Sequence, residues 1–132
     1  FLLGVVSPEA GLTRTELKYD PAVPIIPTPL APSSTWNVTS TVSGLAVGVY
    51  SIYTERYQGR VDAFGDLTTP FGTFPVRRIA VDLTRTVGAT FTTKRTFAFV
   101  SECYGTVATI TSQDYETGAE FTRAAEIWRL AP

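Results

Sequence analysis

The sequence contains no histidine and no methionine, and Cys103 is its single cysteine. Without histidine, this chain alone cannot form a Ser-His-Asp or Cys-His catalytic arrangement, nor a zinc site that uses histidine or several cysteines. It also contains no Ser-x-x-Lys motif and no glycine-rich phosphate loop before a helical pattern. We therefore predict that the protein is not an enzyme and that it has no cofactor and no metal site.

A lone cysteine cannot form a disulfide within the chain, so Cys103 indicates no disulfide framework. We expect it to be a small buried hydrophobic residue on a strand. The missing methionine indicates that the sequence is a processed product or a part of a longer chain. Removal of a leader would fit an extracytoplasmic protein, and a fragment would fit the sequence equally well.

Charge is sparse and evenly spread. Charged residues make up 17% of the chain, against about 25% in an average protein, and the net charge is −1. The nearest approach to a basic patch is the pair Arg77-Arg78, so we expect no nucleic-acid binding. No apolar run approaches the roughly 18 residues that a membrane-spanning helix requires, so we expect no transmembrane span.

We predict two parts, an extended N-terminal arm over residues 1–33 and an antiparallel β domain over residues 34–132. Residues 12–20 could form an edge strand, whereas the prolines of residues 21–32 remove backbone donors and favour an unpaired polyproline II conformation. The apolar side chains of the arm should pack on this domain or on a neighbouring molecule. They are predicted to be the partner-docking residues: Phe1, Leu2, Leu3, Val23, Ile25, Ile26 and Leu30.

The rest of the chain alternates apolar and polar residues between short turns, which is typical of β-strands. Predicted strands begin at Trp36 and continue over residues 49–61, 65–69, 74–85, 90–102 and 104–112. Residues 119–130 fit a helix or a closing strand, and we favour the strand. Turns are predicted at residues 69–72 and 87–88, and a bulge is predicted at Arg77-Arg78, where the apolar face switches.

These elements predict an all-β fold, an antiparallel meander of six or seven strands curled into a barrel, half-barrel or sandwich. Six aromatic residues could line one concave face of the sheet. They could form an ordinary β core, or a pocket for an apolar ligand. The candidate ligand-binding residues are Trp36, Tyr53, Tyr57, Phe91, Phe97 and Phe99.

Residues 65–83 (GDLTTPFGTFPVRRIAVDL) contain a G-x-x-x-T-P-x-G-T-F hairpin pattern. This hairpin resembles that of uncharacterised envelope proteins and lipoproteins of Gram-negative bacteria. Residues 27–36 resemble the P-L-x-x-G-x-x-W entry of the same proteins into their first body strand, although Ser33-Ser34-Thr35 stands where their glycine is expected. Some of these relatives are similar to half-barrel lipoprotein carriers, whose helices plug the concave face, and no such helix is predicted here. The resemblance implies an extracytoplasmic location, which is periplasmic, outer-membrane-associated or extracellular, and no known activity.

Two functional hypotheses follow. The first is a non-catalytic structural or interaction protein of the bacterial envelope or cell exterior, which docks on a protein partner or assembles with itself through its N-terminal arm. The second is a carrier or binding protein for a lipid or another apolar small molecule.

Overall fold

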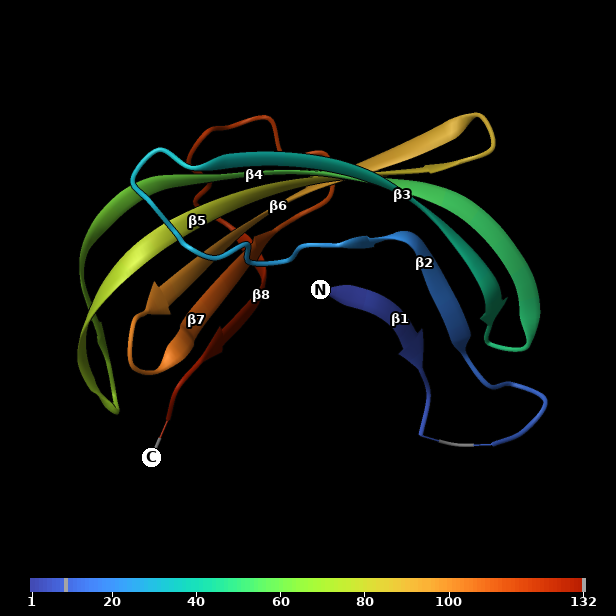
Figure 1. The fold of residues 1–132 in the computed structure, drawn as a ribbon, viewed down its shortest axis with the longest axis horizontal. Helices are drawn as coiled ribbons and strands as arrows, with labels where there is room; N and C mark the ends of the chain where they lie inside the picture. The colour runs from blue at the N-terminus through green and yellow to red at the C-terminus, as the bar shows by residue number, and fades with distance from the viewer. Residues whose placement is uncertain (9, 132) are drawn as a thin grey trace.

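The computed structural model describes residues 1–8 and 10–131, and in that part of the chain all regular elements are β-strands. The eight strands are β1 (Leu2–Val6), β2 (Glu16–Val23), β3 (Thr35–Ala46), β4 (Val49–Thr69), β5 (Gly72–Val87), β6 (Thr90–Ser101), β7 (Gly105–Ser112) and β8 (Ala124–Arg129). They form one antiparallel sheet in chain order, from β1 at one edge to β8 at the other. Figure 1 shows this sheet curled into a half-barrel.

Short turns join the long central strands, which is why neighbours in sequence are neighbours in the sheet. Two-residue loops connect β3 to β4, β4 to β5 and β5 to β6. In the last of these, Gly88 has a φ of 59°, a conformation that glycine adopts without steric cost. Such tight turns fix the register and therefore decide which side chains share a face.

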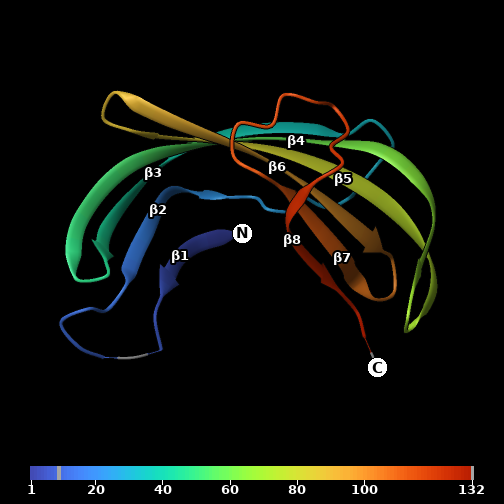
Figure 2. The same cartoon turned by 180° about the vertical axis from the view of Figure 1, so that it is seen from behind.

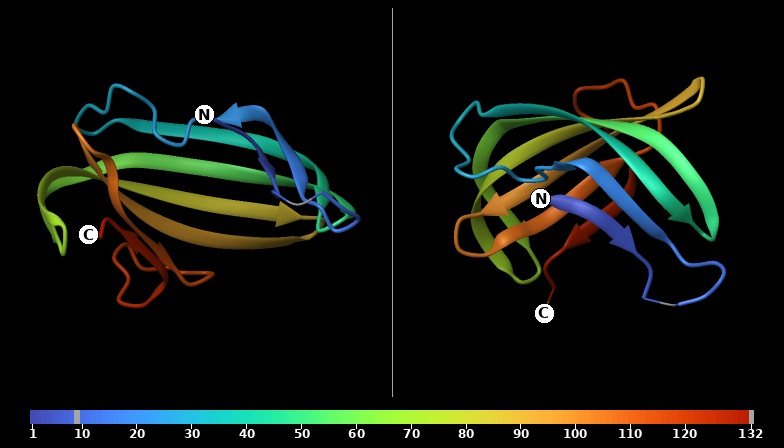
Figure 3. Two further views of the ribbon diagram at one scale, coloured as in Figure 1. Left: turned by 90° about the horizontal axis from the view of Figure 1, so that it is seen from below. Right: turned by 45° about the vertical axis from the view of Figure 1, so that its right-hand side comes forward.

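The sheet has two differently covered faces. One face, which we call the front face, is crossed by residues 24–34, which we call the strap (Figure 1). The back face carries residues 113–123, which we call the β7–β8 loop and which comes forward in Figure 2. The two further views in Figure 3 also separate the strap from the β7–β8 loop.

Apolar clusters lie on both faces, so the centre of the sheet is covered from both sides. On the front face, Tyr19, Val23 and Val42 form one buried cluster, and Val61, Ile79 and Ala98 form a second. On the back face, the buried cluster contains Phe74, Val76 and Val107. Strands buried on two faces read as continuous apolar runs, as Ile79-Ala80 does.

Four sequence predictions need correction. The described residues form eight strands and not six or seven, because β1 and β2 lie within the predicted arm and both pair with the sheet. Residues 49–61 and 65–69 belong to one continuous strand, β4. The predicted bulge at Arg77-Arg78 lies instead on the partner strand, where Asp62 is the extra residue opposite the Arg78–Ile79 step. Cys103 is exposed in the turn between β6 and β7 and is not buried.

Other predictions are confirmed. The fold is all-β and antiparallel, the turns at residues 69–72 and 87–88 are present, and the ambiguous C-terminal segment contains a strand, β8. A helix long and apolar enough to cross a membrane is not found among the described residues.

Candidate functional site

A groove on the front face lies between the strap and strands β4 to β7. It has a volume of about 1120 Å³, and its lining is mainly apolar. The lining residues include Ile26, Pro29, Leu30, Pro32, Val61, Phe64, Pro75 and Val100, with Thr28, Asp66, Arg77, Ser101, Glu102 and Thr106 among the polar ones.

The strap is held to the sheet by both apolar and polar contacts. Ile26 and Leu30 pack against the front cluster around Ile79. The amide of Val61 donates to the carbonyl of Ser34 at 2.9 Å, and the Arg77 guanidinium donates to the carbonyl of Leu30. The strap has no strand pairing along residues 24–34. It is therefore these contacts that hold it in place as one wall of the groove.

A buried carboxylate lies on the same face, toward the other end of β4. Glu55 is 0% exposed, and its Oε1 atom lies 2.7 Å from Nη2 of Arg85 on β5. The hydroxyl of Tyr57 donates to Oε2 of Glu55, and the Arg85 guanidinium lies 5.1 Å from the centre of the Tyr53 ring. The negative charge of Glu55 is therefore paired with a cation and also hydrogen-bonded, as a buried charge requires.

The tyrosines around Glu55 are held in their neutral form. Burial, together with the nearby charge of Glu55, raises the pKa of Tyr19 to about 12. Burial and the hydrogen bond to Glu55 raise the pKa of Tyr57 well above its usual range. Burial also raises the pKa of Tyr53, although the charge of Arg85 opposes this. These hydroxyls are hydrogen-bond donors at neutral pH and not general bases.

Burial of the Arg85 guanidinium lowers its pKa, but the hydrogen bond and the charge of Glu55 outweigh burial and raise it overall. The Arg85 guanidinium therefore stays charged at neutral pH. The Glu55–Arg85 pair is thus a polar contact inside an apolar face.

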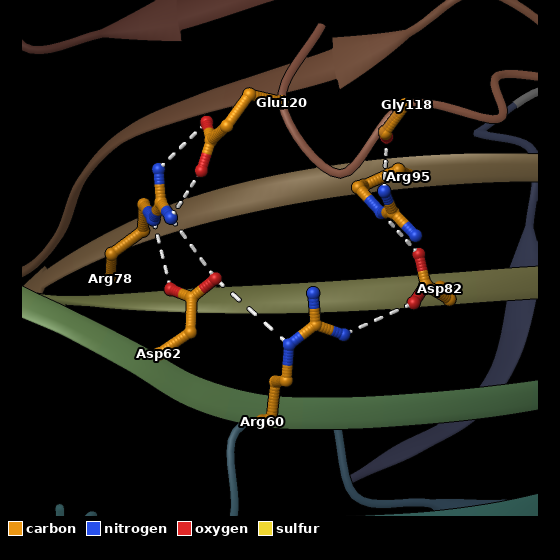
Figure 4. Close-up of polar contacts among 7 residues, drawn as sticks. All are labelled: Arg60, Asp62, Arg78, Asp82, Arg95, Gly118 and Glu120. Atoms are coloured by element: carbon orange, nitrogen blue, oxygen red, sulfur yellow. Dashed lines mark hydrogen bonds and ion pairs between the residues drawn. The ribbon is translucent and has the colours of Figure 1, made fainter. Parts of the chain in front are cut away.

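A ladder of ion pairs lies on the back face (Figure 4) and joins β4, β5 and β6 to the β7–β8 loop. Arg78 lies 2.8 Å from Asp62 and 2.6 Å from Glu120, each measured between nitrogen and carboxylate oxygen. Arg95 lies 2.5 Å from Asp82 and also donates to the carbonyl of Gly118. The ladder is completed by Arg60, which lies 3.3 Å from Asp82 and 4.0 Å from Asp62.

An aromatic stack accompanies this ladder. The ring of Phe97 on β6 stacks on Phe121 of the β7–β8 loop with a centroid distance of 5.2 Å. The guanidinium of Arg78 lies 4.4 Å from the centre of the same Phe97 ring. The hydrogen bonds to Asp62 and Glu120 raise the pKa of Arg78, so this cation remains charged. The ladder and the stack together fix the β7–β8 loop on the sheet.

The six aromatic residues predicted to line one face lie on two faces. Trp36, Tyr53 and Tyr57 pack against the front clusters. The pairs Val87 with Thr90 and Ile79 with Ala98 set the register of β5 and β6, and side chains alternate along each strand. Phe91, Phe97 and Phe99 therefore point to the back face, and the expectation of one aromatic-lined concave face is wrong.

The predicted docking residues also divide into two groups. Leu2, Val23, Ile26 and Leu30 pack against the front clusters of this chain. Phe1, Leu3 and Ile25 are exposed.

Sequence reasoning did not identify Glu55, Arg85 or Tyr19 as parts of one cluster. A signal for Glu55 was present, because it falls between Tyr53 and Tyr57 at the spacing that points to the same face of a strand. A carboxylate in that position must be buried with a partner, although the sequence does not show which cation supplies it.

Among the described residues, no three histidine, cysteine, aspartate or glutamate side chains are grouped so that they could hold a metal ion. Comparison with protein-family models, with curated proteins and with solved structures found no match to this chain.

Proposed function

We propose that the protein binds a lipid acyl chain or a similar apolar small molecule in the groove under the strap. The groove itself carries this proposal, since it is large, mainly apolar and bounded by an ordered segment of the same chain. Ligand pockets commonly have volumes of about 300–1,000 Å³ and apolar walls with a few polar groups. The groove has this character, and we infer that binding, not chemistry, is its role.

The polar residues of the groove are placed to orient such a ligand. Arg77, Asp66 and Glu102 lie along it, whereas Val61 and Val100 supply apolar wall. An acyl chain would lie against the valines, and a polar head group would remain near the charged residues and water. This arrangement supports an amphipathic ligand over a purely hydrocarbon one.

A binding assay with a matched control tests the proposal. Phe64 lines the groove and is 84% exposed, so Phe64→Asp should leave the fold intact and place a charge where the ligand lies. Phe71 does not line the groove and is 54% exposed at the turn after β4, so Phe71→Asp is the control. We expect a fluorescent long-chain fatty acid to bind the wild type and the control equally, and to bind Phe64→Asp about tenfold more weakly. No binding to the wild type, or equal binding to both variants, would disprove the proposal.

A second proposal is that the protein assembles with further copies of itself through β1. The outer edge of β1 has no strand partner within the described residues, and β1 carries no charged residue or proline that would block an added strand. Leu3 and Val6 are exposed beside that edge. An exposed, uncharged edge offers a row of hydrogen bonds to a strand of another molecule.

The test of this second proposal uses a point substitution. Removal of residues 1–33 would also delete β2 and most of the strap. We expect the wild type to assemble in light scattering and Val5→Lys to be monomeric, because a lysine on an edge strand opposes strand addition. Val87→Lys, at the end of β5, is the control. A monomeric wild type would contradict the proposal.

We also propose that the protein is located outside the cytoplasm, in the bacterial envelope or beyond it. The support for this is the resemblance of the hairpin at residues 65–83 to envelope proteins. Fractionation of the source cells should recover the protein outside the cytoplasmic fraction, and recovery with cytoplasmic enzymes would contradict this location.

A further inference from the structure

Exposed aliphatic side chains gather at one end of the molecule, where two loops meet. Leu12, in the connection between β1 and β2, is 97% exposed, and Val47, in the turn between β3 and β4, is 68% exposed. The loops are joined by two backbone donors. The amide of Gly48 donates to the carbonyl of Arg14 at 2.9 Å, and that of Val47 donates to Oγ1 of Thr15 at 3.2 Å. Figure 1 shows both loops at the same end of the sheet.

We call Leu12, Val47, Val49 and Tyr50 the apolar tip. All four side chains are at least two-thirds exposed. Large apolar residues on loop tips are unusual, because such tips are ordinarily occupied by small and polar residues. Leu12 and Val47 lie in the two hydrogen-bonded loops, and Val49 and Tyr50 begin β4 beside them, so exposed apolar side chains surround this end of the sheet.

Val47 occupies this position at a conformational cost. Val47 and Gly48 have φ values of 51° and 80°, so both central residues of this two-residue loop are in the left-handed region. A turn of this kind favours Asn-Gly, and a β-branched residue with positive φ is an outlier. The equivalent turn between β5 and β6 places Gly88 at the left-handed position. A valine in this strained conformation does not stabilise the turn. The fold alone therefore does not explain why an apolar residue stands there.

A shallow groove on the back face continues from the apolar tip. It is lined by Leu3, Val6, Leu45 and Tyr50, with Glu16 and Lys18 at its border. Arg14 and Glu16 form an ion pair at 3.4 Å, so the charges near the tip are nearly balanced. The end of the molecule is therefore aliphatic, protruding and close to neutral.

We propose that the apolar tip inserts into the surface of a phospholipid bilayer. A protruding loop fits a fluid lipid surface, which needs no complementary shape, better than it fits the flat and closely packed interface of a protein. The hydroxyl of Tyr50 can remain at the head-group level while its ring enters the hydrocarbon, and Arg14 and Lys18 can extend toward the phosphates.

This docking surface is distinct from the groove under the strap. The two share no lining residue, and they lie toward opposite ends of β4, since the apolar tip precedes Ser51 and the groove begins at Val61. The inference therefore does not depend on ligand binding in that groove, and a Phe64→Asp protein should still dock on a bilayer.

Vesicle flotation with the full chain tests the inference. The wild type should float with phosphatidylcholine vesicles, and flotation should persist at high salt because insertion of aliphatic groups is not screened. The double variant Leu12→Ser/Val47→Asn should lose about tenfold in vesicle affinity. Phe71→Ser removes an exposed apolar side chain from a turn at the opposite end of β4 and should float like the wild type.

The stability of the double variant separates docking from folding. Because asparagine tolerates the left-handed conformation, Val47→Asn should keep or raise the thermal midpoint while vesicle binding falls. A wild type that does not float, a double variant that floats equally, or binding that high salt abolishes would each overturn the inference. A wild type that ignores vesicles and instead forms a discrete protein complex would also overturn it.

Discussion

The two faces of the sheet are covered by similar lengths of irregular chain that are held by different forces. The strap on the front face is held mainly by Ile26 and Leu30, which pack on apolar strand residues. The β7–β8 loop on the back face is held by the ladder of Arg78, Arg95 and their carboxylates. Apolar contacts are not directional, whereas paired charges with stacked rings fix geometry. The comparison teaches that the two segments depend on different contacts, so we expect apolar substitutions to loosen the strap and loss of charge to loosen the β7–β8 loop.

The largest effect is expected from Arg85→Ala on the front face. This change removes the cation from Glu55, whose side chain is buried, and leaves a carboxylate with only hydrogen-bond partners. We expect a loss of about 2–3 kcal/mol in the free energy of unfolding, since breaking a buried ion pair is more costly than breaking an exposed one. Urea denaturation measures this loss in the free energy of unfolding.

A second substitution sharpens that result. Adding Glu55→Gln to Arg85→Ala removes the unpaired charge and should recover part of the lost stability. If the double variant is as unstable as the sum of the two single variants, the charges of Glu55 and Arg85 are not coupled.

The second-largest loss of stability is expected from Gly59→Ala, also on the front face. A Cβ atom at position 59 would lie 2.1 Å from the ring of Trp36, so the indole would have to move. Because Trp36 packs against the cluster that holds the strap, we expect a loss of about 1–3 kcal/mol and a changed tryptophan emission. Gly65→Ala on the same strand has open space around its Cβ and is the control. Equal effects of the two substitutions would contradict the close contact.

On the back face, Arg78→Ala should cost about 1–2 kcal/mol, because it removes the partner of Asp62 and Glu120 and the cation above Phe97. Hydrogen exchange should accelerate in the β7–β8 loop and stay unchanged in the strap. High salt should weaken the β7–β8 loop in the wild type but not the strap. Equal acceleration in both segments would show that the two faces are not held independently.

The smallest effect on stability is expected from the hydroxyl of Tyr19, and only at high pH. The folded pKa of Tyr19 is about 12, against 10.0 for the free side chain, so the unfolded chain releases its proton first as pH rises. This contribution to stability is complete below about pH 10 and is lost as pH rises toward about 12. Tyr19→Phe should therefore flatten the alkaline limb of the stability profile. An unchanged limb would show that Tyr19 titrates normally.

The alternation and turns of the chain were sufficient to predict the antiparallel meander. The turn at Val87-Gly88 was read correctly because glycine supplies its left-handed position. The strand β1 was missed because a short apolar segment without alternation has no strand period, and only its pairing with β2 makes it a strand. The proline-rich composition of residues 21–32 also concealed that Pro21 continues β2.

Strand periodicity alone could not predict how the aromatic residues divide between the two faces of the sheet. Alternation shows that Phe97 and Phe99 share a side, but only the register across β5 shows that this side is opposite to Trp36. The extra residue at Asp62 shifts the register again within β4. The groove under the strap depends on where residues 24–34 cross the sheet, and that crossing is set by contacts distant in sequence.

The most direct test of the central claim is a methyl NMR titration of the wild type with a long-chain fatty acid. The methyl groups of Ile26, Val61 and Val100 line the groove and should shift together, with contacts to the acyl chain, while those of Val87 at the end of β5 should not move. Absence of shifts at Val61 and Val100 at saturating fatty acid, or shifts of equal size at Val87, would contradict ligand binding under the strap.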